Sequence, residues 1–118
     1  MNIIFGAENI PELTEKYTIL ELDTLRIPGM IKPITAYCVI ETIGIFNLPR
    51  VPELKSLHEN LMINYRRKDW KFCEDAIEFL RGFWGGEMDT FYDEIQNRIN
   101  KYKESDPGET WDGIIDKT

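Results

Sequence analysis

Hydrophobic residues recur at helical spacing in the second half of the chain. Leucines repeat at steps of three and four residues between Leu54 and Tyr65, which predicts a helix from about Glu53 to Arg67. Asp69 then stands where the N-cap of a further helix belongs. The two segments therefore predict a tight antiparallel helical hairpin.

The second helix of this hairpin, from Trp70 to Trp84, is apolar on two sides. Its two stripes consist of Trp70, Cys73, Ile77, Leu80 and Trp84, and of Phe72, Ala76, Phe79 and Phe83. A helix that is apolar over so much of its surface needs cover on both sides. We therefore expect this helix to be central, with the rest of the chain packed around it.

A third helix is predicted to open near Asp89, after the helix-ending pair Gly85-Gly86, and to close near Lys103. The acidic tail beyond it contains Trp111, which either folds back on the helices as a clasp or serves as a peptide handle for a partner. We favour the clasp, because the isoleucines that follow Trp111 would otherwise also be exposed.

The first half of the chain is rich in β-forming residues. Residues 2–5 predict a short strand, and the runs Tyr17–Ile27 and Ile34–Ile45 predict an antiparallel hairpin with a turn at Pro28-Gly29. Within the first run, alternation places Leu20 and Leu22 on one face, with Ile19, Glu21 and Asp23 on the other. Residues 7–16 fit a helical turn or an irregular connection equally well.

These elements predict an α+β fold, in which a small antiparallel β-sheet (a hairpin plus a short N-terminal strand) is followed by three helices and a docked C-terminal tail. We expect a single domain over residues 1–118. It divides into a β-rich half at 1–47, a helical hairpin plus third helix at 52–104, and a tail at 105–118.

Charge and composition narrow the function classes. The net charge of −7 argues against direct binding to nucleic acid or anionic lipid, which requires a positive field. No apolar run is long enough for a membrane span, and no signal peptide is evident, so we expect a cytoplasmic protein. Cys38 and Cys73 lie in apolar patterns, which favours buried free thiols over the alternative of a disulfide.

Candidate chemistry is sparse. His58 is the only histidine, and a lone histidine beside an acid is ordinarily a surface or half-buried residue. We therefore predict no catalytic residue, no metal site and no cofactor. The acids between Glu74 and Asp93 could serve acid–base or divalent-metal chemistry, but solvation and helix-end electrostatics also explain them.

Parts of the sequence resemble known proteins. The hairpin resembles a tetratricopeptide-like helix pair through Tyr65, Asp69, Trp70, Cys73, Ile77 and Leu80. Residues 57–118 are similar to the C-terminal tail of bacterial class III adenylate/guanylate cyclases, through Tyr65-Arg66-Arg67-Lys68-Asp69-Trp70, Tyr92 with Arg98, and Trp111-Asp112-Gly113. The catalytic cyclase domain has no counterpart here, so this likeness implies no cyclase activity.

The full length, including the segments Tyr17–Thr24 and Ala36–Glu41, resembles small uncharacterised proteins of T4-like cyanophages and other marine phages. This resemblance implies a source, with the host cytoplasm as the compartment, and implies no activity.

The function we expect is that of a nonenzymatic protein-binding or regulatory module, such as a phage accessory protein that acts on a host or viral protein. The predicted binding residues are Arg66, Arg67 and Tyr37. Two alternatives are a small carboxylate-based or metal-dependent hydrolase, whose acids would converge in a pocket, and an acidic mimic of nucleic acid, whose charges would lie in parallel rows.

Overall fold

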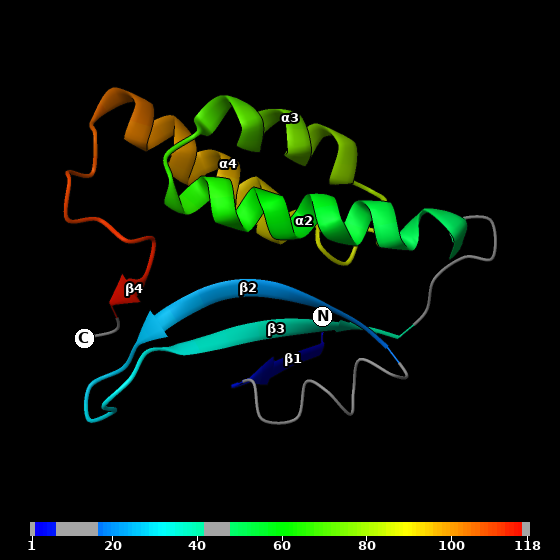
Figure 1. The fold of residues 1–118 in the computed structure, drawn as a ribbon, viewed down its shortest axis with the longest axis horizontal. Coiled ribbons are helices and arrows are strands. Elements are labelled where there is room, and N and C mark those ends of the chain that lie inside the picture. Colours follow the sequence, from blue (N-terminus) through cyan, green and yellow to red (C-terminus); the bar gives the residue numbers. More distant parts are fainter. Residues whose placement is uncertain (1, 7–16, 42–47, 117–118) are drawn as a thin grey trace.

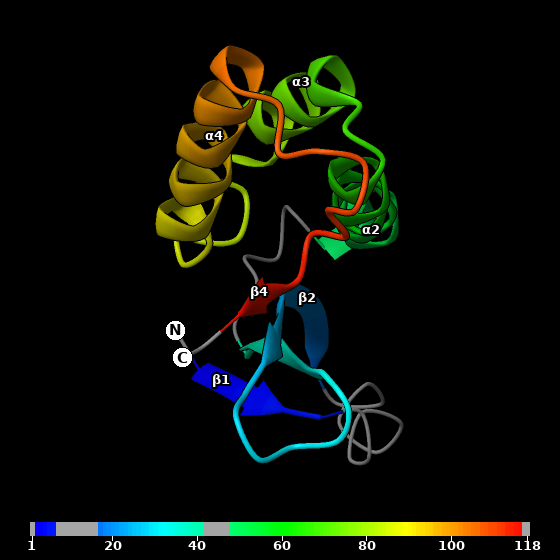
Figure 2. The same cartoon turned by 90° about the vertical axis from the view of Figure 1, so that its left-hand side faces the viewer.

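A four-stranded sheet forms one layer of the protein, and helices cover one of its faces (Figures 1 and 2). The structure is a computed structural model that describes residues 2–6, 17–41 and 48–116. The strands are β1 (Asn2–Phe5), β2 (Thr18–Arg26), β3 (Ile34–Ile40) and β4 (Ile115–Asp116), and the helices are the short 3-10 helix η1 (Leu48–Arg50) and the α-helices α2 (Val51–Arg66), α3 (Trp70–Leu80) and α4 (Asp89–Glu104). The predicted α+β fold is confirmed.

The sheet has the strand order β1-β3-β2-β4, and β3 pairs antiparallel with both β1 and β2. The β2–β3 connection turns at Pro28-Gly29, as predicted, with a hydrogen bond of 3.1 Å from the Met30 amide to the Ile27 carbonyl. Gly29 has a φ of +87°, which suits glycine at the third position of such a turn. β4 pairs parallel with the end of β2, a strand that the sequence pattern does not predict.

The register of β2 shifts between Glu21 and Thr24, and this irregularity changes where Asp23 points. Strict alternation predicts Asp23 on the face opposite Leu22. In the structure Leu22 is buried, yet Asp23 accepts hydrogen bonds of 2.8 and 3.0 Å from Arg98 of α4. A bulge re-aims side chains in this way. The prediction that Asp23 lies on the face opposite Leu22 is therefore wrong.

Helices α2 and α3 form the predicted antiparallel hairpin. The Asp69 side chain accepts a hydrogen bond from the Phe72 amide at 3.2 Å, which confirms it as the N-cap of α3. Cys73 allows close approach of the two helices, because its thiol lies 3.7 Å from the Leu61 carbonyl.

The position of α3 differs from the prediction of a central helix. Figures 1 and 2 show that α2 and α4 lie over the sheet, whereas α3 lies above them on the side away from the sheet. α3 also ends at Leu80, because Arg81 is extended and Gly82 has a φ of +82°. Only the first apolar stripe is well covered: Trp84 is 1% exposed, whereas Phe79 of the second stripe is 69% exposed.

Two parts of the predictions fall outside the described residues. These are the connection at 7–16 and the part of the predicted strand Ile34–Ile45 that lies beyond residue 41.

The C-terminal tail docks on the helices through Trp111. The Trp111 ring lies 5.2 Å from that of Tyr65, 5.8 Å from that of Trp70 and 5.1 Å from that of Tyr102, measured between centroids. Asp112 pairs with Arg26. Of the two predicted roles of the tail, the structure shows the clasp.

Trp111→Ala is expected to lower the free energy of unfolding by about 2–4 kcal/mol, because three aromatic rings lose their partner at the centre of the clasp. Chemical denaturation measures this value. Glu109→Ala, an exposed position two residues away, serves as the control and should leave the midpoint within the error of wild type. A wild-type midpoint for Trp111→Ala would mean that the tail is not held by its tryptophan.

Candidate functional site

Two of the three predicted binding residues meet at Glu21 on β2. Tyr37 of β3 is the cross-strand partner of Glu21, and Arg66 of α2 forms an ion pair with the Glu21 carboxylate. Burial raises the pKa of the Tyr37 hydroxyl, and the Glu21 charge raises it further. Arg66 therefore connects α2 to the sheet. Arg67, the next residue, is exposed at the hairpin turn.

His58 lies in the core between α2, α4 and β2. Its side chain is fully buried, so the prediction of a surface or half-buried histidine is wrong. The helical pattern around it gives the reason: Leu54, Leu61 and Tyr65 are all buried on α2, and His58 lies on the same face.

A chain of hydrogen bonds satisfies every polar atom around His58. The Trp84 indole N–H donates to the Tyr92 hydroxyl at 3.0 Å, and that hydroxyl lies 3.0 Å from His58 Nδ1. His58 Nε2 lies 2.6 Å from the carbonyl oxygen of Glu21. Because a carbonyl only accepts, Nε2 carries the proton. In the neutral ring, which burial favours, Nδ1 then accepts from the Tyr92 hydroxyl.

The electrostatics agree with a structural role for this histidine. Burial lowers the pKa of His58 below its ordinary value, against a smaller upward effect of the hydrogen bond to Glu21. Both ring nitrogens have protein partners, so neither is left to act on a substrate or to bind a metal ion. Within the described residues, no buried side-chain nitrogen or oxygen lacks a partner.

The two cysteines are free and buried, as predicted. Burial raises the pKa of the Cys38 thiol to about 11 and that of the Cys73 thiol to about 12. Nucleophilic cysteines require the opposite shift. Neither thiol is therefore suited to nucleophilic catalysis.

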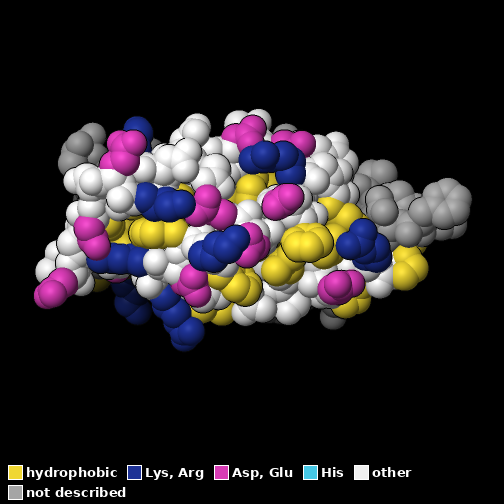
Figure 3. All heavy atoms as spheres, turned by 90° about the horizontal axis from the view of Figure 1, so that it is seen from above, with side chains coloured by type: hydrophobic (Ala, Val, Ile, Leu, Met, Phe, Trp, Pro, Cys, Tyr) yellow, Lys and Arg dark blue, Asp and Glu magenta, His cyan; other side chains and the backbone are white. Residues whose placement is uncertain are grey.

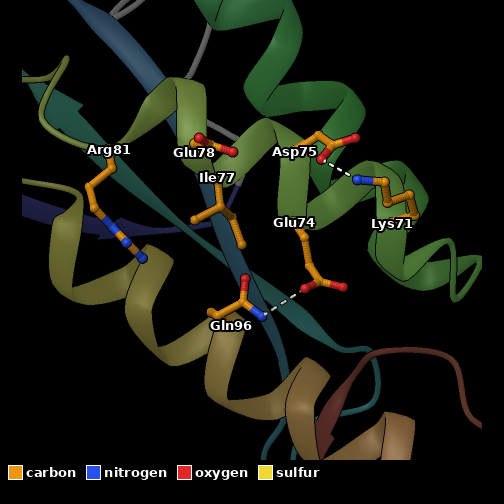
Figure 4. Close-up of a pocket in the computed structure, with 7 residues that line it drawn as sticks. All are labelled: Lys71, Glu74, Asp75, Ile77, Glu78, Arg81 and Gln96. Carbon is orange, nitrogen blue, oxygen red and sulfur yellow. Dashed lines mark hydrogen bonds and ion pairs between the residues drawn. The ribbon is translucent and has the colours of Figure 1, made fainter.

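The acidic residues of α3 line a hollow between α3 and α4 (Figure 4). Its lining residues are Lys71, Glu74, Asp75, Ile77, Glu78, Arg81 and Gln96. Figure 4 shows that Glu74 points toward α4 whereas Asp75 points along α3 toward Lys71. The carboxylates thus share a hollow but diverge within it.

Basic side chains hold these carboxylates apart. Lys103 of α4 pairs with Glu74 of α3 at 2.7 Å, Lys71 pairs with Asp75 at 2.9 Å, and Arg81, just beyond α3, pairs with Asp93 of α4 at 2.6 Å. Over residues 2–6, 17–41 and 48–116, no three His, Cys, Asp or Glu side chains form a group that could hold a metal ion. This geometry lends no support to a carboxylate-based or metal-dependent hydrolase.

Apolar side chains are exposed at one end of the helical hairpin, where α2 begins and α3 ends. We call this surface the hairpin end; it consists of the exposed Leu48 and Phe79, the half-buried Phe83, and Arg50. Leu48 is 52% exposed and Phe79 is 69% exposed. The Arg50 guanidinium lies 5.7 Å from the centroid of the half-buried Phe83 ring.

Figure 3 views the helical side of the molecule and shows hydrophobic areas between charged side chains. Acidic and basic groups alternate over this face and do not gather in single-sign rows. A mimic of nucleic acid needs rows of negative charge, so this face does not support that alternative.

Sequence reasoning identified the second apolar stripe but expected it to be covered, and therefore missed the hairpin end. The available signal was the number of apolar stripes. A short helix in a single hairpin buries one stripe against its partner, and this helix has two. The burial of His58 had a weaker signal in the sequence: its spacing from Leu54 and Leu61 places it on the apolar face of α2.

Comparison with protein-family models, with curated proteins and with solved structures gives no match. None of the described helices is both long enough and apolar enough to span a membrane.

The stability of the protein is expected to fall as the pH drops below 6.5, the ordinary pKa of histidine. The lowered pKa of His58 in the folded state means that the unfolded state binds more protons between the two pKa values. The free energy of unfolding then decreases by at most about 1.4 kcal/mol per pH unit from this residue. Urea denaturation between pH 7.5 and about 5.5, where most carboxylates stay ionised, measures the slope.

His58→Gln is the matched variant, because Gln keeps an N–H donor but does not titrate. We expect it to be less stable at pH 7.5 and to lose the slope below pH 6.5. An unchanged slope in this variant would show that another group causes the dependence.

Proposed function

We propose that this chain is a nonenzymatic protein-binding module that uses the hairpin end as its binding surface. The observation that carries the proposal is the exposure of Phe79, of which 69% is accessible in a helix whose other stripe is buried. Phe79 contributes little to the core in this position. A large exposed aromatic side chain next to other apolar groups is typical of an interaction site.

The composition of the hairpin end agrees with this role. Aromatic and arginine side chains dominate the energetics of many protein interfaces. Phe79 and Phe83 supply aromatic area, and Arg50 is positioned over the Phe83 ring. Leu48 extends the apolar surface beyond the start of α2.

The state of the candidate catalytic groups also supports a binding role. His58 has protein partners on both ring nitrogens, and burial raises the pKa of both thiols. Glu74 and Asp75 are paired with lysines. The likeness to phage proteins suggests a host or viral protein as the partner.

The predicted binding residues Arg66, Arg67 and Tyr37 define a competing surface. Arg67 lies at the hairpin turn, at the opposite end of α2 from Arg50. Arg66 and Tyr37 are less suitable for mutation, since both lie against Glu21 in the fold. Arg67 therefore serves as the probe of this second surface.

Phe79→Ser is expected to reduce partner binding at least about tenfold, as hot-spot truncations do, with little change in stability. The measurement is affinity capture from a lysate of the native host with wild type and variant side by side, followed by titration of the captured protein. Ile63→Ser is the matched control, because Ile63 is 42% exposed on the same hairpin and lies outside the hairpin end.

Arg67→Ala provides the second comparison. If Arg67→Ala reduces capture and Phe79→Ser does not, the partner binds at the hairpin turn and the hairpin end is the wrong surface. If Phe79→Ser, Arg67→Ala and Ile63→Ser all capture the same protein as well as wild type does, that protein is a nonspecific contaminant. The proposal would then fail.

A further inference from the structure

The open edge of the sheet at β1 is a second feature that the proposed function does not use. β1 is a terminal strand in the order β1-β3-β2-β4, and no described strand covers its other side. Its sequence, Asn-Ile-Ile-Phe, has no charged residue and no proline. Apart from its short length, β1 lacks the features that usually protect an edge strand from pairing with another chain.

The register determines which backbone groups this edge presents. Antiparallel pairing places Phe5 opposite Ala36, and the Gly6 amide donates to the Thr35 carbonyl at 2.9 Å. The hydrogen-bonding direction alternates along an antiparallel strand. The N–H and C=O groups of Ile4 therefore point toward β3, and those of Ile3 and Phe5 point away from it, toward the open edge.

The same two residues also present their side chains. Ile3 pairs with Cys38 and Phe5 with Ala36, so both side chains lie on the face that the helices cover elsewhere. Ile3 is nevertheless 48% exposed and Phe5 58% exposed. They line a groove between β1 and α4, together with Leu22, Leu25, Phe91 and Glu94.

The charge of the groove selects the type of occupant. Asp23 and Glu94 share Arg98, so these three side chains together carry one net negative charge. The side chains of Asp23 and Arg98 are 17% and 16% exposed, whereas that of Glu94 is 57% exposed. A bound segment therefore meets an apolar floor and an accessible carboxylate.

We propose that the β1 edge binds an extended peptide segment of a partner protein, which adds a strand beside β1. The peptide carries apolar side chains at alternate positions, to fill the groove next to Ile3 and Phe5, and a lysine or arginine that pairs with Glu94. Backbone hydrogen bonds supply affinity in this mode of recognition, and the alternating side chains supply specificity. The β1 strand of a second copy has no lysine or arginine to pair with Glu94, which disfavours self-pairing at this edge.

This site is separate from the hairpin end, so each proposal can fail alone. The probe is a displayed library of random ten-residue peptides, selected on the full chain. We expect the selected peptides to alternate apolar residues and to contain a basic residue. Their affinities are then measured by fluorescence anisotropy for wild type and variants.

Phe5→Pro tests the edge directly, because it removes an outward N–H and leaves the β1–β3 hydrogen bonds in place. Loss of one backbone hydrogen bond should weaken the selected peptide about 3- to 10-fold. Phe5→Lys, which keeps the backbone donor but removes the apolar side chain, gives a second test if the proline variant unfolds. Phe79→Ser should leave peptide affinity unchanged.

Glu94→Gln tests the charge and should weaken basic peptides about 2- to 5-fold. Glu104→Gln on the same helix is the matched control and should have no effect. Selection of acidic peptides, or equal binding to wild type and to both Phe5 variants, would overturn the proposal. If wild type forms dimers and Phe5→Pro does not, the edge serves self-association instead.

Discussion

The hydrogen bond from His58 to the Glu21 carbonyl joins the helical layer to the sheet, and much of the structure depends on it. The carbonyl belongs to β2, and the donor, His58 Nε2 of α2, lies 2.6 Å from it. In the neutral ring the proton lies on Nε2, because Nδ1 faces the Tyr92 hydroxyl as an acceptor. An unpaired carbonyl or imidazole in this position would cost about 1–3 kcal/mol. Through its hydrogen bond to His58, Tyr92 connects α4 to this site. Trp84, which donates to Tyr92, connects the segment after α3 to it as well.

β2 carries the other connections between the layers as well. The bulge in β2 turns Asp23 toward Arg98 of α4, and the Glu21 carboxylate pairs with Arg66 of α2. The end of β2 holds β4, while Arg26 pairs with Asp112 in the tail. The polar groups of one strand therefore fix the positions of α2, α4 and the tail. Hydrophobic burial is not directional, so these polar contacts specify the arrangement of the layers.

The sequence allowed the elements to be predicted but not all of their positions. Helical periodicity and the Asp69 cap predicted the hairpin, because both are local signals. Periodicity shows that a face is buried and does not show what buries it. For this reason the outer position of α3 and the exposure of Phe79 were not foreseen.

Other features depend on contacts between distant parts of the chain. The bulge at Asp23 is stabilised by Arg98, 75 residues later, so alternation alone gave the wrong face. β4 has two residues, too few for a pattern, and it pairs with β2 in a tail that Trp111 docks on the helices. The burial of His58 likewise requires Tyr92, which lies 34 residues further along the chain. Of the predicted site, Tyr37 and Arg66 came together at Glu21, which neither residue's local sequence indicates.

The two surfaces proposed for binding have a common physical origin. A layer of two helices covers β2 and β3, but it leaves Ile3 and Phe5 of β1 exposed at the edge. α3 packs on the outer side of this layer with one stripe, which leaves Phe79 of the other stripe exposed. Neither exposure contributes to the core, and each places large apolar side chains in water at a cost to solubility. The hairpin end offers side chains alone, whereas the β1 edge also offers backbone groups, so of the two surfaces the β1 edge is the one that suits the extended peptide segment we propose.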